Sequence, residues 1–453
     1  MSDRVVVVGG GISGLAAAHE AARLGRDVTV LEATTRVGGK IDSGFVDGAD
    51  LPFPVDMAAD GFLARQPEVT ELCYELGLGD ALVSPTGAQA FIWANGRLCS
   101  IPSPSVLGVP LDADAVAASG IVSAAGAADF AARIDTITAP LIGDASVGEV
   151  LRPCVGDEVF EHLIDPLLGG INAGNADGLS IDAGAAQLAD AARAGGSLRD
   201  ALRAQVGKAQ AAAAGPVFNG VEGGNRRIID ALHTELGDRV RTSEAVVGLD
   251  RDGSSWLVRT GQATYPADRV VLATPAWISA DLISSHAPAA AAPLAELAYG
   301  DAVLVTFVID KAQVEHPLDG SGFLVPRAEG LLMTACSWAS SKWAHYDDGR
   351  HAILRVSAGR TDDARWLHLT PDELVAQLCD ELVQTVGLRG EPAIRLTPWK
   401  RSLPQYRPGH LDRCDSLDAE LTATMPGVTL TGAQMRGLGL PACVRQGRQA
   451  GAV

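Results

Sequence analysis

The first forty residues constrain the fold more than any other part of the chain. Residues 5–8 are four consecutive valines, which is typical of a strand buried in a parallel sheet. Gly9, Gly11 and Gly14 follow in the spacing G-x-G-x-x-G, and Glu32 comes 18 residues after the last of them. The first glycine allows a tight turn, the second lets a pyrophosphate approach the backbone, and the third lets helix and strand pack closely. The pattern therefore predicts a dinucleotide site.

The chemistry of this predicted site follows from the ends of its elements. Free N–H groups and the dipole at the N-terminus of the helix favour the negative charge of a pyrophosphate. Glu32 follows a second predicted strand, residues 27–31, and its carboxylate can accept a hydrogen bond from a ribose hydroxyl. The alternative is a glycine-rich turn that binds nothing. The order of strand, glycines, helix, strand and acid favours the dinucleotide.

A second pair of glycines distinguishes a flavin dinucleotide from NAD. Residues 36–40 read Arg-Val-Gly-Gly-Lys shortly after the acid. Adjacent Gly38 and Gly39 would bring a second stretch of backbone to the diphosphate, and Arg36 or Lys40 would add positive charge. The segment resembles the extended R-x-G-G fingerprint of flavoproteins related to amine oxidases, so FAD is the predicted cofactor. A basic surface turn is the alternative.

Composition limits the size, compartment and partners of the protein. Its 453 residues are enough for two or three domains, and its net charge of −19 argues against nucleic acid and anionic membranes as partners. No apolar run approaches the roughly 18 residues of a membrane span. The sequence starts directly with a strand, so we expect no signal peptide and a cytoplasmic protein. The seven cysteines include no C-x-x-C pair and the nine histidines no metal-binding spacing, so we expect reduced thiols and no metal site.

Periodicity along the rest of the chain predicts an α/β protein. The Ala-rich residues 105–215 have a helical pattern, and we expect their low-complexity end, residues 209–215, to be a mobile loop. Residues 371–386 also predict a helix. Further patterns predict a last helix from Pro441 and strands at residues 240–249, 256–260, 269–273, 303–309, 322–325, 331–337, 352–357 and 429–432.

Six sequence blocks resemble one family of flavoproteins. They run in the family's order over nearly the whole chain, at residues 56–65, 155–159, 165–174, 320–326, 403–410 and 436–443. The most specific blocks are Asp-Pro-Leu-Leu-Gly-Gly-Ile, which begins at Asp165, and Pro-Gln-Tyr-x-x-Gly-His, which begins at Pro404. On these blocks the chain resembles the oxygen-dependent coproporphyrinogen III and protoporphyrinogen oxidases.

The resemblance implies an α/β fold with three parts. These are a Rossmann-type FAD-binding domain built from discontinuous segments, a mixed-sheet substrate domain and a helical domain. The implied FAD-binding domain comprises residues 1–64, 216–276 and 425–453. The implied substrate domain comprises residues 65–104 and 277–424, and the helical domain residues 105–215.

By matching position, the resemblance also implies which residues bind FAD without a covalent bond. They are Gly9, Gly10, Gly11, Ile12, Ser13, Gly14, Glu32, Ala33, Arg36, Gly39, Lys40, Ala58, Ala59, Asp60, Gly61, Val246, Trp399, Leu438, Gly439 and Leu440. The helix predicted from Pro441 would direct N–H groups at the electron-rich O2 edge of the flavin. Cys443 lies near the expected flavin, and we interpret it as a packing residue.

The reaction implied by the resemblance removes hydrogens from a porphyrinogen, with the flavin as acceptor and O₂ as reoxidant. The implied partners are the porphyrinogen, O₂ and a ferrochelatase that would take over the product. The candidate substrate-binding residues are Arg65, Asn172 and Arg407, and no catalytic base is assigned. A surface ion pair is the alternative for Arg65, and a cap on a glycine-rich turn is the alternative for Asn172.

The helical segment 110–146 bears on the choice of porphyrinogen. It carries five aspartates against Arg133 alone, whereas a membrane-docking surface needs cations and large apolar side chains. This favours coproporphyrinogen, the more soluble substrate. Three alternatives stay open: a protoporphyrinogen IX oxidase, an FAD-dependent amine oxidase, and a non-catalytic FAD-binding protein. An amine oxidase would need two aromatics at the flavin where this chain has Gln434 and Met435, and Ala58 and Gln66 depart from the family pattern.

Overall fold

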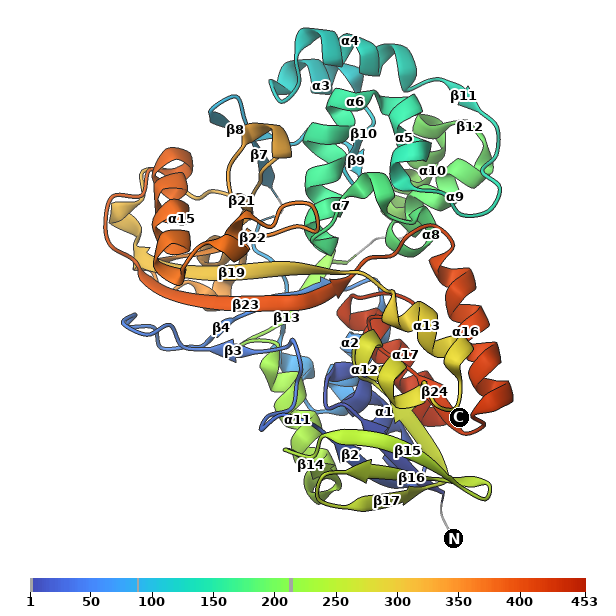
Figure 1. Ribbon diagram of the computed structural model, residues 1–453. Helices are drawn as coiled ribbons and strands as arrows, with labels where there is room; N and C mark the ends of the chain where they lie inside the picture. The colour runs from blue at the N-terminus through green and yellow to red at the C-terminus, as the bar shows by residue number, and fades with distance from the viewer. Residues whose placement is uncertain (1–2, 88, 212–214) are drawn as a thin grey trace.

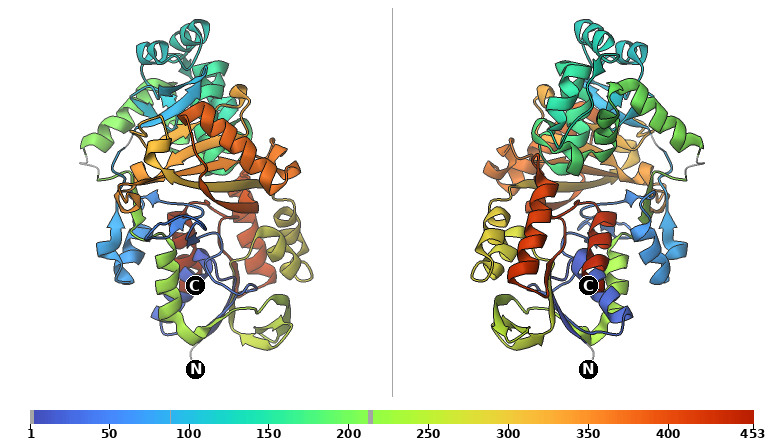
Figure 2. Two further views of the ribbon diagram at one scale, coloured as in Figure 1. Left: turned by 90° about the vertical axis from the view of Figure 1, so that its left-hand side faces the viewer. Right: turned by 90° about the vertical axis from the view of Figure 1, so that its right-hand side faces the viewer.

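The computed structural model describes residues 3–87, 89–211 and 215–453. The chain forms three stacked parts (Figure 1). A parallel sheet flanked by helices lies at the bottom of this view, a mixed sheet crosses the middle, and a group of helices lies at the top. The two side views show the same order (Figure 2).

The lower sheet has five parallel strands that come from distant parts of the sequence. Their order is β14, β2, β1, β18 and β24. They span Val240–Arg241, Asp27–Leu31, Arg4–Val8, Arg269–Leu272 and Val428–Leu430. The valines of β1 are buried on both faces of the sheet because other elements cover both sides. This discontinuous sheet confirms the predicted Rossmann-type unit.

Different elements cover its two faces. Helices α1, α2, α11 and α17 pack on one face around Val5 and Val7 of β1. An antiparallel meander, β15–β17, packs on the other face with helices α12, α13 and α16, around Val6 and Val8. The helices span Ile12–Arg23 (α1), Pro67–Glu75 (α2), Arg226–Leu236 (α11), Ala276–Ile283 (α12), Pro288–Ala295 (α13), His410–Thr424 (α16) and Leu440–Ala452 (α17). The meander strands span Val246–Asp252, Ser255–Thr260 and Thr264–Ala267.

Helices α1 and α17 bring the two ends of the chain into close contact. A Cβ atom on Gly447 would lie 2.3 Å from the carbonyl oxygen of Ser13, and one on Gly451 would lie 2.1 Å from that of Ala17. Both pairs advance by four residues in the same direction, so the helices run parallel. Ser13 is the second residue of α1, whereas Gly447 is the eighth residue of α17, so α17 has six more residues before the contact. The N-terminus of α17 therefore reaches about 9 Å further along the shared axis.

Seven strands form the mixed sheet in the order β23, β19, β22, β21, β20, β7 and β8. They span Ala393–Pro404, Tyr299–Asp310, His351–Ala358, Met333–Trp338, Gly322–Leu324, Ala90–Ala94 and Arg97–Ser100. Helix α15, Pro371–Val386, lies at the predicted position and covers one face, where Val305 and Phe307 of β19 are buried. Val308 belongs to a buried cluster on the other face with Met57.

Helices α3–α10 form the upper part around one buried cluster. They span Ala113–Ser119, Ala124–Arg133, Val147–Val155, Asp157–Val159, Asp165–Asn172, Ile181–Gly184, Ala186–Ala194 and Leu198–Ala211. Short strand pairs are β9 with β10 (Ser105–Val106, Val109–Pro110) and β11 with β12 (Ile137–Thr138, Gly196–Ser197). In the lower part β3 pairs with β4 (Ser43–Gly44, Val55–Asp56), and β13 with β5 and β6 (Phe218–Val221, Phe62–Leu63, Leu82–Val83). None of the helices described is both long and apolar enough to cross a bilayer.

Two local predictions differ from the structure, and some strands of the mixed sheet were not predicted. The single strand expected at residues 240–249 is divided between β14 and β15, because Ser243 turns the backbone with a φ of +59° between two different sheets. Strand β23 was not predicted. It is an edge strand interrupted by Pro398 and charged residues, so it has no clear alternation. Helix α10 continues to Ala211 where a loop was expected, and residues 212–214 of that expected loop lie outside the described residues.

The contact between α1 and α17 predicts the effect of one added methyl group. We expect Gly447→Ala to destabilise the fold by about 1–3 kcal/mol, because the new Cβ must push the two backbones apart. Gly207→Ala in α10 is the matched control, since a Cβ there meets no atom within 4 Å. It should leave stability unchanged or slightly raised. Thermal unfolding of both variants measures this, and equal midpoints would contradict the role of the contact.

Candidate functional site

The carboxyl ends of β1, β2, β18 and β24 meet at one edge of the parallel sheet, and the loops that follow them form the candidate site. After β1 the chain continues through α1 to β2 on one side, whereas β18 lies on the other side. Open α/β sheets bind their ligands where the strand order reverses in this way. The glycine motif lies at this point.

The glycine turn leaves one face of the backbone open. Gly9 has a φ of +106°, and a Cβ atom on Gly14 would lie 2.0 Å from its carbonyl oxygen, so neither position accepts a side chain. A Cβ atom on Gly11, by contrast, would meet nothing within 4 Å. Gly11 is also the N-cap of α1 and supplies no side-chain cap, so the first N–H groups of the helix, from Ile12 and Ser13, stay available to an anion.

Glu32 lies against this turn, as the motif predicts. Its Oε2 accepts a 2.7 Å hydrogen bond from the backbone N–H of Gly10. Its Oε1 accepts bonds from the N–H and the hydroxyl of Thr34, at 2.9 and 2.7 Å. A carboxylate has about four acceptor positions. Oε2 therefore keeps capacity for a ribose hydroxyl, and the exposed Ala33 lies next to it.

The second glycine pair joins the first. Gly38 donates a 2.8 Å hydrogen bond to the carbonyl of Gly10, and a Cβ atom on Gly39 would lie 3.3 Å from the Cα of Gly11. The guanidinium of Arg36 donates to the carbonyl of Gly39 at 2.9 Å, so it supports its own turn. Lys40 is exposed and makes no ion pair with any described carboxylate. Of the two predicted cations, Lys40 is therefore the one available to a diphosphate.

The turn before α17 has the same chemistry as the turn before α1. Gly439 is the N-cap of α17 and supplies no side-chain cap. Leu438 and Leu440 flank it and are half-buried. The hydroxyl of Thr431, at the end of β24, is buried and has no hydrogen-bond partner among the described residues. The uncapped N-terminus of α17 therefore directs its first N–H groups to a point about 9 Å beyond the N-terminus of α1.

A charged cluster beneath the mixed sheet holds the turn of Ala58, Ala59, Asp60 and Gly61. Arg355 of β22 is buried, lies 2.7 Å from Asp60 and donates to the carbonyl of Ala58. Lys342 and the indole of Trp343 also donate to Asp60, each at 3.1 Å. Although burial opposes it, the two cations and the indole hold the pKa of Asp60 far below its usual range. Asp60 is therefore a permanent anion that anchors the turn.

Asp56 lies four residues before Asp60, at the end of β4, and its pKa is shifted in the opposite direction. Burial raises its pKa from 3.8 to about 6, against the hydrogen bond from Ser43 and the charge of Arg355, which both favour the carboxylate. Tyr346 donates to its second oxygen at 3.1 Å, and the backbone N–H of Asn225 donates at 2.9 Å. Asp56 thus ties three separate segments to the turn.

Two further predicted FAD residues lie at the margins of this arrangement. The indole N–H of Trp399, in β23, donates to the carbonyl of Met57 at 2.9 Å, directly before Ala58. Val246 begins β15, and the N–H of nearby Glu244 donates to the carbonyl of Glu32 at 2.9 Å. Trp399 therefore lies beside the Ala58 turn, and Val246 near the ribose end of the candidate site.

The three predicted substrate residues have different surroundings. Arg65 follows β5, is exposed and makes no ion pair or side-chain hydrogen bond with any described residue. Arg407 is also exposed, and its guanidinium packs over Gly178. Asn172 is buried, and its amide donates to the carbonyl of Leu168 at 2.8 Å, so its side chain bonds to its own helix. Within the described part of the chain neither guanidinium is paired, so both arginines can bind a carboxylate, whereas the amide of Asn172 is already paired.

Comparison with known proteins identifies the family. The model for flavin-containing amine oxidoreductases matches residues 12–452. The chain belongs to this family. A coproporphyrinogen III oxidase of Bacillus subtilis is 30% identical over 99% of this chain and 98% of its own. A coproporphyrinogen III oxidase of Mycobacterium leprae is 34% identical over 97% of this chain and 95% of its own. These relatives confirm the resemblance, and the family confirms the predicted flavin.

A solved structure confirms the fold. A crystal structure from Exiguobacterium sp. 255-15, of a protein described as a candidate protoporphyrinogen oxidase, is 31% identical. It superposes with a TM-score of 0.88 and covers 99% of this chain and 98% of its own. The arrangement of the glycine turn, the mixed sheet and the helical part is thus shared over the full length of the chain.

The residues at the sheet edge fit a flavin dinucleotide. The open backbone at Gly11 suits a pyrophosphate, and Glu32 suits a ribose. The N-terminus of α17, with Gly439, lies further along the same direction and suits a group beyond the pyrophosphate that accepts hydrogen bonds. One extended ligand with an acceptor at its far end therefore matches the order of these groups.

Sequence reasoning missed the residues that hold the site together. Arg355, Lys342 and Asn225 were not singled out, although each bonds to the segment 56–60. One signal was present, because Arg355 is the only charged residue in the apolar core of β22, residues 352–358. A lone arginine in such a strand must find a buried partner.

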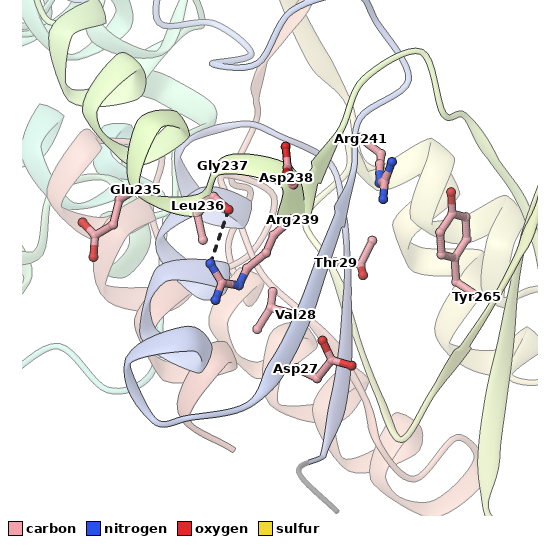
Figure 3. A pocket seen from close by; sticks show the side chains of 10 residues that line it. All are labelled: Asp27, Val28, Thr29, Glu235, Leu236, Gly237, Asp238, Arg239, Arg241 and Tyr265. Carbon is pink, nitrogen blue, oxygen red and sulfur yellow. Dashed lines mark hydrogen bonds between the residues drawn. The ribbon is translucent and has the colours of Figure 1, made fainter.

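Two cavities lie away from these residues. One, of about 440 Å³, is open and polar and lies at the outer edge of the parallel sheet, between β2, β14 and the end of α11 (Figure 3). The other, of about 540 Å³, is mainly apolar and lies among helices of the upper part. Neither is lined by any predicted cofactor or substrate residue.

Asp56 generates a prediction about pH. Because its folded-state pKa of about 6 exceeds the ordinary 3.8, the folded protein keeps a proton that the unfolded chain releases. This carboxyl therefore stabilises the fold at low pH, and the contribution is lost as the pH rises through about 6. As the pH is raised from 4 to 6, we expect the thermal midpoint of the wild type to decrease relative to that of Asp56→Asn. Asp47→Asn, at an exposed position, is the control, and its midpoint should change with pH as that of the wild type does. If the midpoints of Asp56→Asn and the wild type changed in parallel with pH, the raised pKa of Asp56 would be contradicted.

Proposed function

We propose that the protein oxidises coproporphyrinogen III to coproporphyrin III in haem biosynthesis, with non-covalently bound FAD and with O₂ as the final acceptor. One observation carries the proposal. Relatives of this name match nearly the full length of both chains at 30% and 34% identity. The groups at the sheet edge support it, because they offer a flavin dinucleotide the contacts it needs.

The proposed FAD site uses the residues described above. The pyrophosphate would lie at Gly9–Gly14 with Lys40, the ribose at Glu32, and the flavin between the Ala58 turn and residues 438–440. Cys443 is buried near this turn, and burial raises the pKa of its thiol. A protonated thiol is a poor nucleophile, which supports non-covalent binding. The flavin would lie between the two sheets.

When bound at this site, a flavin would supply the redox chemistry: it would take up a hydride from a bridging methylene of the macrocycle and be reoxidised by O₂, so that a full oxidation would remove six electrons and form three H₂O₂. The chain's own residues would bind the flavin and the macrocycle and orient them toward each other. The pyrrole N–H proton can leave without a protein base because the product becomes aromatic, so no catalytic base is assigned. The permanent anion of Asp60 holds the Ala58 turn in place without a proton of its own.

The substrate side is proposed to recognise propionates. Coproporphyrinogen III has four of these carboxylates, and a protein with a net charge of −19 needs local cations to attract them. The guanidinium groups of Arg65 and Arg407 have no partner among the described residues, and such groups suit carboxylates through two parallel hydrogen bonds. A ferrochelatase is the proposed receiver of the released product.

Two alternatives are less well supported. An amine oxidase would place aromatic side chains at the flavin, but Gln434 and Met435 are buried, and the amide of Gln434 donates to the carbonyl of Thr431 at 2.7 Å. A protoporphyrinogen oxidase would use a more apolar substrate. The acidic helical segment 110–146 disfavours it.

The proposal predicts the outcome of rapid mixing without oxygen. Coproporphyrinogen III should bleach the bound flavin, and it should do so faster than protoporphyrinogen IX at equal concentration. Stopped-flow absorbance near the visible flavin bands measures both rates. A panel of primary amines is the control and should leave the flavin oxidised. Bleaching by an amine alone would support the amine oxidase, and no bleaching at all would support a non-catalytic protein.

A second prediction concerns Arg65. A charge-assisted bond to a carboxylate contributes about 1.5–3 kcal/mol, so Arg65→Ala should lower kcat/KM about ten- to a hundredfold. If the contact is equally strong in the ground and transition states, most of this decrease should come from a higher KM. FAD content should stay intact. Arg239→Ala is the control, because this exposed arginine lines the outer cavity of Figure 3. Unchanged kinetics in Arg65→Ala would move the anchor to Arg407.

A further inference from the structure

Three segments that are distant in the sequence meet at the boundary of the helical part. They are the C-terminal end of α7, residues 431–439, and the residues that follow β23. We call the last of these, residues 405–410, the link segment. It contains all of the specific block Pro-Gln-Tyr-x-x-Gly-His except Pro404, and the end of α7 lies within the block that begins at Asp165. The two most specific blocks of the sequence are therefore in contact.

Gln405 binds the end of α7. Its side chain is buried, and its amide nitrogen donates to the carbonyl of Asn172 at 2.8 Å and to that of Leu403 at 3.0 Å. A Cβ atom on Gly174 would lie 2.3 Å from its amide oxygen, so that glycine makes room for the side chain. Ala173, which follows the last residue of α7, has a φ of +45°, and this backbone conformation is strained for any residue other than glycine. Such a conformation persists only where neighbouring contacts enforce it.

Tyr406 binds the other segment. Its hydroxyl donates to the carbonyl of Ala433, and its ring is stacked on that of His410 at 4.3 Å. The ring of His410 donates to the carbonyl of Met435 at 2.6 Å. Burial lowers the pKa of His410, so this histidine stays neutral and structural. Two carbonyls of the loop before α17 are thus held by one short stretch of chain.

The two contacts join segments that differ in exposure. Ile171 and Gly170, at the end of α7, are exposed although their neighbours are buried. Leu438, in the proposed flavin turn, packs against the buried cluster of the helical part, which includes Leu168 of α7 and Tyr406. The link segment therefore connects a surface of the helical part with the turn that would hold the flavin.

We propose that Gln405 and Tyr406 are positioning residues that hold the end of α7 at a set distance from the flavin turn, and so set the macrocycle against the flavin. The inference rests on the proposed function for its substrate and flavin, but the mechanical coupling between the two segments is independent of it. A tight distance matters because the hydride must travel directly between the two partners, and small misplacements cost large factors in rate.

Tyr406→Phe tests this with the smallest change, because it removes one hydroxyl and keeps the ring. In the FAD-loaded variant we expect the saturating rate of flavin reduction by coproporphyrinogen III to fall at least fivefold. The half-saturating concentration should change less than twofold, and FAD content should match the wild type. Gln405→Met, which keeps the volume and removes the donor, should give the same pattern. A purely structural role would lower the thermal midpoint but leave the saturating rate of the loaded enzyme unchanged.

Hydrogen–deuterium exchange of the same loaded proteins supplies a readout without substrate. In Tyr406→Phe, amides of both residues 433–440 and residues 170–175 should exchange faster, by about fivefold for the loss of one hydrogen bond. Tyr265→Phe is the control, since its hydroxyl bonds to Glu244 at 3.2 Å beside the outer cavity, and it should change neither segment. Faster exchange confined to residues 433–440, or a saturating rate within twofold of the wild type, would overturn the proposal. If the wild type is not reduced by the porphyrinogen, the proposed function fails and the exchange data alone decide the coupling.

Discussion

The contact between α1 and α17 determines the geometry of the candidate site. Gly447 and Gly451 allow the last helix to lie directly on the carbonyls of Ser13 and Ala17, near the start of the chain. Because the two helices are parallel and out of step by about 9 Å, their uncapped N-termini present N–H groups at two points along one direction. Glycine at these two positions of α17 therefore brings two helix N-termini together, and each of them can bind an electron-rich group. The loops of the parallel sheet then surround this pair of helix ends.

A second constraint joins the mixed sheet to this unit. Arg355 lies in the interior of the mixed sheet, and its charge needs a partner because burial of an unpaired guanidinium is costly. Asp60 is that partner, and its own charge is secured by Lys342 and Trp343. The same arginine holds the carbonyl of Ala58, so the turn proposed to contact the flavin is set by a side chain from another sheet. The charge pairing thus orients the two sheets and the turn together.

Local patterns predicted the elements that depend on local chemistry. Helix α15 lies where residues 371–386 were predicted, because Thr370 and Glu373 form a capping box and Gly387 ends the helix in a left-handed conformation. The glycine turn and Glu32 are also in contact, as the spacing required. Strand β23 and the division of residues 240–249 were not predicted, because an edge strand and a change of sheet depend on which neighbours are present. The pairing of the Asn172 amide with its own helix could not be predicted for the same reason.

The sequence by itself determined the first strand–helix–strand unit, the class of cofactor and the family, because these depend on residues within about twenty positions of each other and on blocks that keep their order. Only the tertiary structure decided which distant groups meet. Arg355 reaches Ala58 across 297 positions, and Gln405 reaches Asn172 across 233. Such contacts depend on how complete surfaces pack, since a buried donor accepts whichever carbonyl the packing of helices and sheets brings within reach. The chemistry at the sheet edge could therefore be predicted, whereas the contacts that position it became visible only in the folded chain.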